Sequence, residues 1–274
     1  MENKAVILQP GKVGDLIICS PIAKYYKDKG YHVEWFIYPE FKEFFERIDY
    51  ATPIYSEALL DSEQKYLKST NKRVTPFNTL KHKYFLETAR KYASFEGEPK
   101  KRLLDICWGF QGSNKENDRK VNLYAQTNRT WIQLRYDLAQ VPIDERWKFE
   151  WNRDLDKENE LLKIVKQKAL HLFGKEEFSI VHNYDDLKKS KIDKIKDISN
   201  CINFEPIEGY QVYDWLTTLE HAKTITCVDS SLCNFVEVCS SLKSVKKYYL
   251  GTEEKHYYSF MDNILRNNWN LVPE

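Results

Sequence analysis

The sequence lacks the features that mark membrane, secreted and zinc-binding proteins. No apolar run approaches the roughly 20 residues that span a bilayer, and the first residues lack the order of a signal peptide. The six cysteines include no Cys-x-x-Cys pair and lie in apolar surroundings, which argues against disulfides and a zinc site. We therefore expect a soluble, cytoplasmic protein whose thiols are reduced and buried.

Neither sign of charge dominates the chain. It carries 42 Lys and Arg against 41 Asp and Glu, so the net charge of +1 does not indicate a dedicated nucleic-acid binder. A hydrophobic fraction of 42% without low-complexity runs excludes a disordered chain. At 274 residues, the chain is long enough for one large or two ordinary domains.

What the sequence does contain is an alternation of strands and helices. The first βαβ unit combines an apolar strand at 5–9, a helix at 15–30 that ends at Gly30, and a strand at 32–38. The second half repeats this pattern, with strands at 178–183, 224–228 and 245–251 and a last helix at 253–269. We expect an α/β protein with two Rossmann-like halves, 1–152 and 153–274.

Asp15 is the first candidate functional residue, because it follows the first strand in the stretch PGKVGDLIICSP. An acid at this place can be a helix cap, part of a phosphate loop or a catalytic base. The stretch resembles a phosphate cradle that includes Lys12 and Gly14, but it lacks the Gly-Lys-Ser/Thr ending and the Gly-x-Gly-x-x-Gly fingerprint.

A second candidate site lies at 224–234, where TITCV is followed by Asp229, Ser230 and Ser231. The free N–H groups of the helix that follows favour a phosphate, although Asp229 or Ser230 alone is also an ordinary N-cap. Other candidates follow strand ends. They are His182, Lys188 and Lys189 as phosphate or sugar ligands, Glu208 and Asp214 as ribose ligands, and Trp108 and Gln111, which the family resemblance given below places on the acceptor side.

Two segments, 7–38 and 213–238, resemble the ADP-heptose:lipopolysaccharide heptosyltransferase family, glycosyltransferase family nine. The resemblance implies a GT-B fold, an acceptor-side domain at 1–152, a nucleotide-sugar-binding domain at 153–274, and a last helix that packs back on the first domain. It implies no metal and no cofactor, since the nucleotide-sugar is a co-substrate.

The resemblance also implies roles for single residues. Asp15, in the short Gly-Asp loop, matches the base that takes the acceptor proton, and Lys188 or Lys189 matches the basic residue on the diphosphate. The donor-binding turn matches Asp229, Ser230, Ser231 and Leu232. Ser231 replaces the family's turn glycine and Asn234 its histidine, while HNYDD replaces a glycine-rich loop, so the sugar and a lipopolysaccharide acceptor stay open.

Three functions follow from these observations. The first is an inverting transfer of a hexose, heptose or pentose from a nucleotide-sugar to a glycan, lipid-linked glycan or lipopolysaccharide. The second keeps this chemistry and changes the acceptor to a hydroxylated or hydroxymethylated pyrimidine in DNA, as in phage enzymes. The third is a nucleotide-sugar-binding protein without catalysis, which the fold alone does not exclude.

Overall fold

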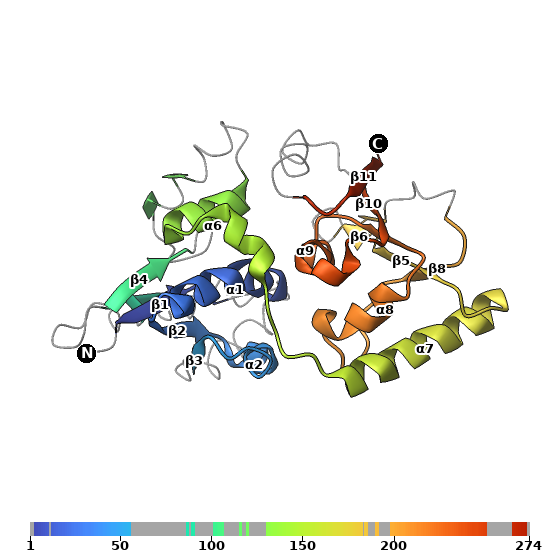
Figure 1. Ribbon diagram of the computed structural model, residues 1–274, viewed down its shortest axis with the longest axis horizontal. Helices are drawn as coiled ribbons and strands as arrows, with labels where there is room; N and C mark the ends of the chain where they lie inside the picture. The colour runs from blue at the N-terminus through green and yellow to red at the C-terminus, as the bar shows by residue number, and fades with distance from the viewer. Residues whose placement is uncertain are drawn as a thin grey trace, which may run out of the picture. The chain divides into compact units, whose positions relative to one another are not determined.

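The computed structural model divides the chain into two compact units, Met1–Trp151 and Asn152–Glu274. It describes residues 3–10, 12–55, 86–87, 89–90, 101–106, 115–116, 119–120, 130–182, 184–185, 190–191, 198–250 and 265–272. Figure 1 shows the elements of both units along the chain. No helix within these residues is long and apolar enough to cross a membrane.

Unit 1 is built around a parallel sheet with the strand order β3-β2-β1-β4. The strands are β1 (Lys4–Leu8), β2 (His32–Ile37), β3 (Thr52–Tyr55) and β4 (Lys101–Asp105). The helices are α1 (Val13–Asp28), α2 (Lys42–Phe45) and α6 (Trp131–Ala139), with the short helical turns η1 (Pro39–Phe41) and η3 (Ile143–Lys148). Four successive apolar residues of β1 are fully buried, which is the pattern of a parallel strand covered on both faces.

Unit 2 contains a second parallel sheet with the order β11-β10-β9-β5-β8. Its strands are β5 (Ser179–His182), β8 (Cys201–Asn203), β9 (Thr224–Cys227), β10 (Lys246–Leu250) and β11 (Trp269–Val272). Two short strands, β6 (Tyr184–Asp185) and β7 (Ser190–Lys191), pair separately. The helices are α7 (Leu155–Phe173), α8 (Leu216–Glu220) and α9 (Ser231–Val238), with turns η4 (Val212–Trp215) and η5 (Ser240–Leu242).

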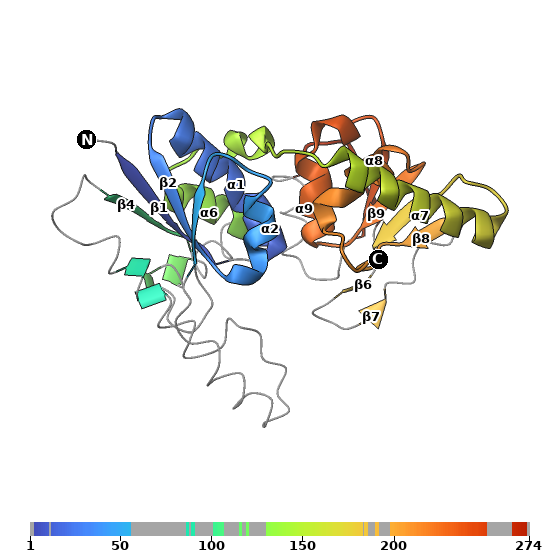
Figure 2. The ribbon, with the colours of Figure 1, turned by 90° about the horizontal axis from the view of Figure 1, so that it is seen from below.

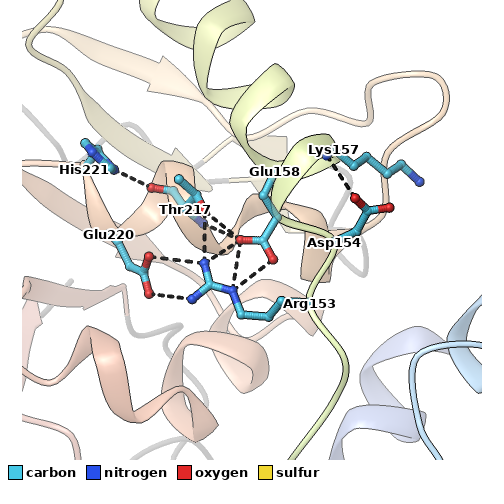
Figure 3. A network of polar contacts seen from close by, with 7 residues as sticks. All are labelled: Arg153, Asp154, Lys157, Glu158, Thr217, Glu220 and His221. Carbon is cyan, nitrogen blue, oxygen red and sulfur yellow. Dashed lines mark hydrogen bonds and ion pairs between the residues drawn. The ribbon is translucent and has the colours of Figure 1, made fainter.

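A polar network at the start of unit 2 connects Arg153 and helix α7 to helix α8. The carboxylate of Glu158, which is 1% exposed, accepts hydrogen bonds from the backbone N–H and the hydroxyl of Thr217, at 3.1 and 2.7 Å. Arg153 binds the same carboxylate and also contacts Glu220 (Figure 3). The network therefore ties the first residues of the unit to its interior.

Each sheet has one point at which the strand order reverses. In unit 1 the chain builds outward from β1 through β2 to β3 and then returns to β4 on the other side of β1. In unit 2 it builds from β5 to β8 and then continues on the other side with β9, β10 and β11. Ligands of open α/β sheets bind outside the carboxyl ends of the strands at such switch points. These points lie between β1 and β4 and between β5 and β9.

Most of the expected strands and helices are present, with two corrections. The helix after β1 begins at Val13, so Gly14 and Asp15 belong to its first turn and not to a loop. The helix expected at 253–269 lies mainly outside the described residues, but its end is wrong, because Trp269 opens strand β11. The proposed packing of that helix on unit 1 also lies outside the described residues.

Candidate functional site

The carboxyl edge of the unit 1 sheet carries the first part of the candidate site. After β1, the backbone carbonyl of Gln9 accepts a hydrogen bond from the indole of Trp35 at 2.7 Å, which fixes the turn into α1. Lys12 is the exposed N-cap of α1, and its side chain makes no capping bond. Asp15 lies in the first turn of α1, where the helix dipole favours a negative charge.

Asp15 is paired with an arginine from a distant part of the chain. The Nη1 atom of Arg135, on α6, lies 2.7 Å from Oδ1 of Asp15. The two side chains are 6% and 14% exposed, so the pair is largely desolvated while the carboxylate still reaches the surface. Among the described residues, no other side chain or backbone group bonds to the second carboxylate oxygen. That oxygen therefore keeps its capacity to accept a hydrogen bond.

Cys19 lies one turn further along α1, beneath this pair. Its Sγ is 3.6 Å from Nη1 of Arg135. Burial raises the pKa of the Cys19 thiol to about 12, although the neighbouring Arg135 acts in the opposite direction. Cys19 is therefore a neutral thiol at physiological pH and has no part in acid–base chemistry.

The switch point of unit 2 is bridged by a side-chain hydrogen bond. His182 ends β5, and its Nδ1 lies 3.0 Å from the hydroxyl of Ser230, which follows β9. The two strand ends are also joined by the backbone, because Val228 N–H donates to the carbonyl of His182 at 2.9 Å. The ring of Phe204 meets the His182 ring edge to face at 5.4 Å and holds its orientation.

Ser230 is also the N-cap of α9. Its hydroxyl accepts from the backbone N–H of Cys233 at 3.2 Å and donates to the carbonyl of Val228 at 3.1 Å. Half-buried Asp229 and Ser231 lie on either side of it. The turn therefore presents a helix N-terminus together with His182 at the carboxyl edge of the sheet, an arrangement that suits an anionic ligand.

The remaining predicted residues fall into three groups. Leu232 and Asn234 are buried within α9, and Asn234 donates to the carbonyl of Ser230 at 2.9 Å, so both shape the turn from inside. Glu208 is exposed in the loop between β8 and η4, away from either strand end in sequence. Lys188, Lys189, Trp108 and Gln111 lie outside the described residues.

Asp214, which the sequence suggested as a ribose ligand, is buried and bonded to other residues of unit 2. It is 1% exposed, accepts from the backbone N–H of Gln211 at 2.8 Å and pairs with Lys157 at 3.2 Å. Within the described ranges, no group of three or more His, Cys, Asp or Glu is arranged to hold a metal ion.

Sequence reasoning missed Arg135 and Gln9. The segment WIQLRYDLA carries Arg135 among residues that alternate irregularly between apolar and polar, so nothing in the local pattern distinguishes this arginine. The signal that could have identified the segment is the capping box formed by Thr130 and Gln133, which marks the start of α6. It does not reveal the partner, since Asp15 is 120 residues away.

No family model matches the chain, and no curated protein sequence does so either. Among solved structures, the chain is similar to a glycosyl transferase of family 9 from Veillonella parvula DSM 2008. The sequences are 8% identical, the match covers 100% of this chain and 86% of the other, and the TM-score is 0.51. E. coli heptosyltransferase WaaC with ADP-2-deoxy-2-fluoro heptose matches at 9% identity over 98% of this chain and 92% of its own, with a TM-score of 0.42.

The likeness to the Veillonella structure concerns the fold. It confirms the predicted class, a mixed α/β protein with parallel sheets of the kind found in GT-B glycosyltransferases. At 8% identity it says nothing of the donor or the acceptor.

Proposed function

We propose that the protein is a glycosyltransferase that moves a sugar from a nucleotide-sugar donor to a hydroxyl acceptor. The observation that carries this proposal is the placement of polar residues at both topological switch points. Asp15 lies after β1 in unit 1, and His182 with the Ser230 turn lies after β5 and β9 in unit 2. The GT-B type of fold supports it, because this fold is shared by the solved family 9 glycosyl transferase.

In this proposal, Asp15 is the general base. The acceptor hydroxyl oxygen forms a bond to the anomeric carbon of the donor sugar, while the bond from that carbon to the diphosphate oxygen breaks. The electron pair leaves on the diphosphate and the hydroxyl proton moves to the carboxylate of Asp15. Attack from the side opposite the leaving group inverts the anomeric carbon. No step in this scheme uses a metal ion or a bound cofactor.

The unit 2 turn is proposed to hold the donor. The first N–H groups of α9 and the side chains of His182 and Ser230 would take the diphosphate charge, with Lys188 or Lys189 as the added cation. The acceptor is proposed to be a glycan, a lipid-linked glycan or a lipopolysaccharide. Duplex DNA with a hydroxylated pyrimidine is the alternative acceptor, and binding without transfer is the alternative function.

The test combines a donor screen with one substitution. The full chain is incubated with a panel of nucleotide-sugars and with glycan or modified-DNA acceptors, and both transfer and release of the nucleoside diphosphate are measured. With the donor and acceptor that support transfer, Asp15→Asn should lower kcat by about 10²-fold or more and leave donor binding intact. Asp28→Asn is the matched control, because Asp28 is the last residue of the same helix and is 58% exposed.

Each alternative predicts a different result. Transfer to modified DNA that falls steeply with salt would replace the glycan acceptor with DNA. Donor binding without turnover on any acceptor would favour the non-catalytic function. Full turnover in Asp15→Asn would overturn the assignment of the base.

A further inference from the structure

Arg135 is a buried cation that is paired with the carboxylate of Asp15. The arginine residue is 5% exposed, and its Nη1 is 2.7 Å from Oδ1 of Asp15. A cation is expensive to bury, and the interior tolerates one where a close opposite charge compensates it. The position of Arg135 and that of Asp15 are therefore linked, although the two residues come from different helices.

The guanidinium group is fixed on two further sides. With the amide of Gln9 oriented so that its oxygen faces the arginine, that oxygen accepts from Nη1 at 3.2 Å and from Nη2 at 3.0 Å. The ring of Trp131 covers the guanidinium at 4.9 Å from its centroid. A planar group that is stacked on one side and bound at both Nη atoms keeps one orientation, which a flexible ammonium group would not do.

The helix that carries Arg135 is itself locked against α1. The hydroxyl of Tyr136 donates to the backbone carbonyl of Ile18 at 2.9 Å, and the hydroxyl of Tyr26 donates to the carbonyl of Ala139 at 2.8 Å. All four residues are buried, and α1 and α6 lie side by side in the ribbon (Figure 2). The direction of the Arg135 side chain is therefore set by rigid packing before any ligand binds.

From this geometry we infer that Arg135 is the positioning residue for the Asp15 base. It holds Oδ1 and so leaves Oδ2 as the oxygen that accepts the hydroxyl proton. The inference rests on the proposed function, in which Asp15 is the base. Arg135 does not touch the reacting atoms in this view, and it acts only through Asp15.

A double-mutant cycle separates this role from direct ligand binding. Arg135→Met should lower kcat by about 10²-fold, with the KM of the donor changed by less than about threefold, because a misdirected base impairs the chemical step. If Arg135 acts through Asp15, the double variant with Asp15→Asn should be no slower than Asp15→Asn alone. If the two single effects instead multiply, so that the kcat of the double variant is about 10⁴-fold below that of wild type, the inference is overturned.

Two further variants exclude a general structural effect. Arg135→Lys retains the charge but not the planar double contact, so it should recover about tenfold of the activity lost in Arg135→Met. Arg146→Lys makes the same change at another fully buried arginine of unit 1 and should leave kcat within about threefold of wild type. An equal loss in Arg146→Lys would contradict a specific role for Arg135.

A measurement without turnover keeps the inference testable if no donor is found. Carboxyl groups of the intact chain are labelled with a carbodiimide and an amine, and mass spectrometry compares Asp15 with Asp28. Arg135→Met should raise the Asp15 to Asp28 labelling ratio several-fold, and Arg146→Lys should not. An unchanged ratio in Arg135→Met would show that Arg135 does not hold Asp15. If the wild-type protein transfers no sugar but Arg135→Met still raises the labelling ratio, the proposed function is refuted and the contact between Arg135 and Asp15 stands.

Discussion

Arg153 holds the buried carboxylate of Glu158 with two of its nitrogen atoms, at 3.0 Å from Nε to Oε1 and 2.5 Å from Nη2 to Oε2. The hydrogen bonds to Glu158 raise the pKa of Arg153 above its ordinary value, so the guanidinium stays charged at any pH at which the protein folds. Figure 3 shows Glu220 on the other side of the guanidinium and Thr217 beside the shared carboxylate. The charge of Glu158 is thus compensated by a residue at the very start of unit 2.

The first prediction is that Arg153→Ala destabilises unit 2 by about 3 kcal/mol. Removing the cation leaves the carboxyl group of Glu158, at 1% exposure, without its ion-pair partner, and breaking a buried pair from one side costs about 3 to 5 kcal/mol. We expect the lower end of this range, because the Arg153 side chain is 30% exposed and water can partly replace it. Urea unfolding of the full chain, followed by circular dichroism, measures the change.

Lys166→Ala provides the matched control for that experiment. Lys166 lies on the same helix as Glu158 and pairs with Glu176 at 3.2 Å, but both side chains are at least 36% exposed. An exposed pair of this kind contributes about 0 to 1 kcal/mol. A loss in Lys166→Ala as large as that in Arg153→Ala would show that burial does not account for the effect.

The sequence predicted the elements that depend on local pattern. Strand β1 was found because a parallel strand buried on both faces reads as a continuous apolar run. Strands β2 and β9 were found although each includes polar residues. Strand β11 was missed, since WNLV is short and follows a polar stretch. Its place depends on pairing with β10 rather than on its own residues.

The candidate site was only half visible in the sequence, because half of it depends on tertiary contacts. Asp15 and Ser230 follow strands directly, so their places at the sheet edges could be inferred from order along the chain. The pairs Asp15 with Arg135 and His182 with Ser230 join residues that are 120 and 48 positions apart. No local periodicity reports such a pair.

The second prediction concerns the pH dependence that Cys19 confers on stability. Burial raises the pKa of its thiol from 9.0 to about 12 in the native state, so the unfolded chain ionises first. The stabilising contribution is complete below about pH 9 and is lost as the pH rises toward 12. Between pH 8 and 10, the free energy of unfolding of wild type should fall by roughly 1 kcal/mol relative to that of Cys19→Ala, in which this ionisation is absent. If the free energy of unfolding changes with pH in the same way in wild type and Cys19→Ala, the prediction is contradicted.

The third prediction is that Trp269→Phe destabilises strand β11 locally. The indole N–H of Trp269 donates to Oε2 of Glu237 at 2.8 Å, and Glu237 is fully buried in α9. The same carboxylate accepts the backbone N–H of Arg266 at 2.8 Å, so Glu237 fixes the approach to β11. Loss of one hydrogen bond to a buried charge should cost about 1.5 to 3 kcal/mol.

Hydrogen exchange reads this effect locally. Amides of β11 and of its neighbour β10 should exchange faster in Trp269→Phe, while amides of β5 and β8 should keep their wild-type protection. Glu237→Gln replaces one of two accepting oxygens by an amide NH2 that faces the N–H of Arg266 or the indole N–H of Trp269, so it should perturb the same amides at least as much. Uniform acceleration across the unit 2 sheet would indicate global destabilisation and would count against a local role.

The last prediction uses Ser230 to separate helix capping from anion binding. Asn and Asp are both good N-caps, so Ser230→Asn and Ser230→Asp should both retain the capping bond to α9. They differ in charge alone. If the α9 turn holds a diphosphate, an added carboxylate beside it repels the ligand, and Ser230→Asp should bind nucleoside diphosphates at least about tenfold more weakly than Ser230→Asn. Isothermal titration with a panel of nucleoside diphosphates measures both variants at low salt. Because the comparison holds shape and capping constant, equal affinities would mean that the turn does not bind the diphosphate, even if the chain proves to be a glycosyltransferase.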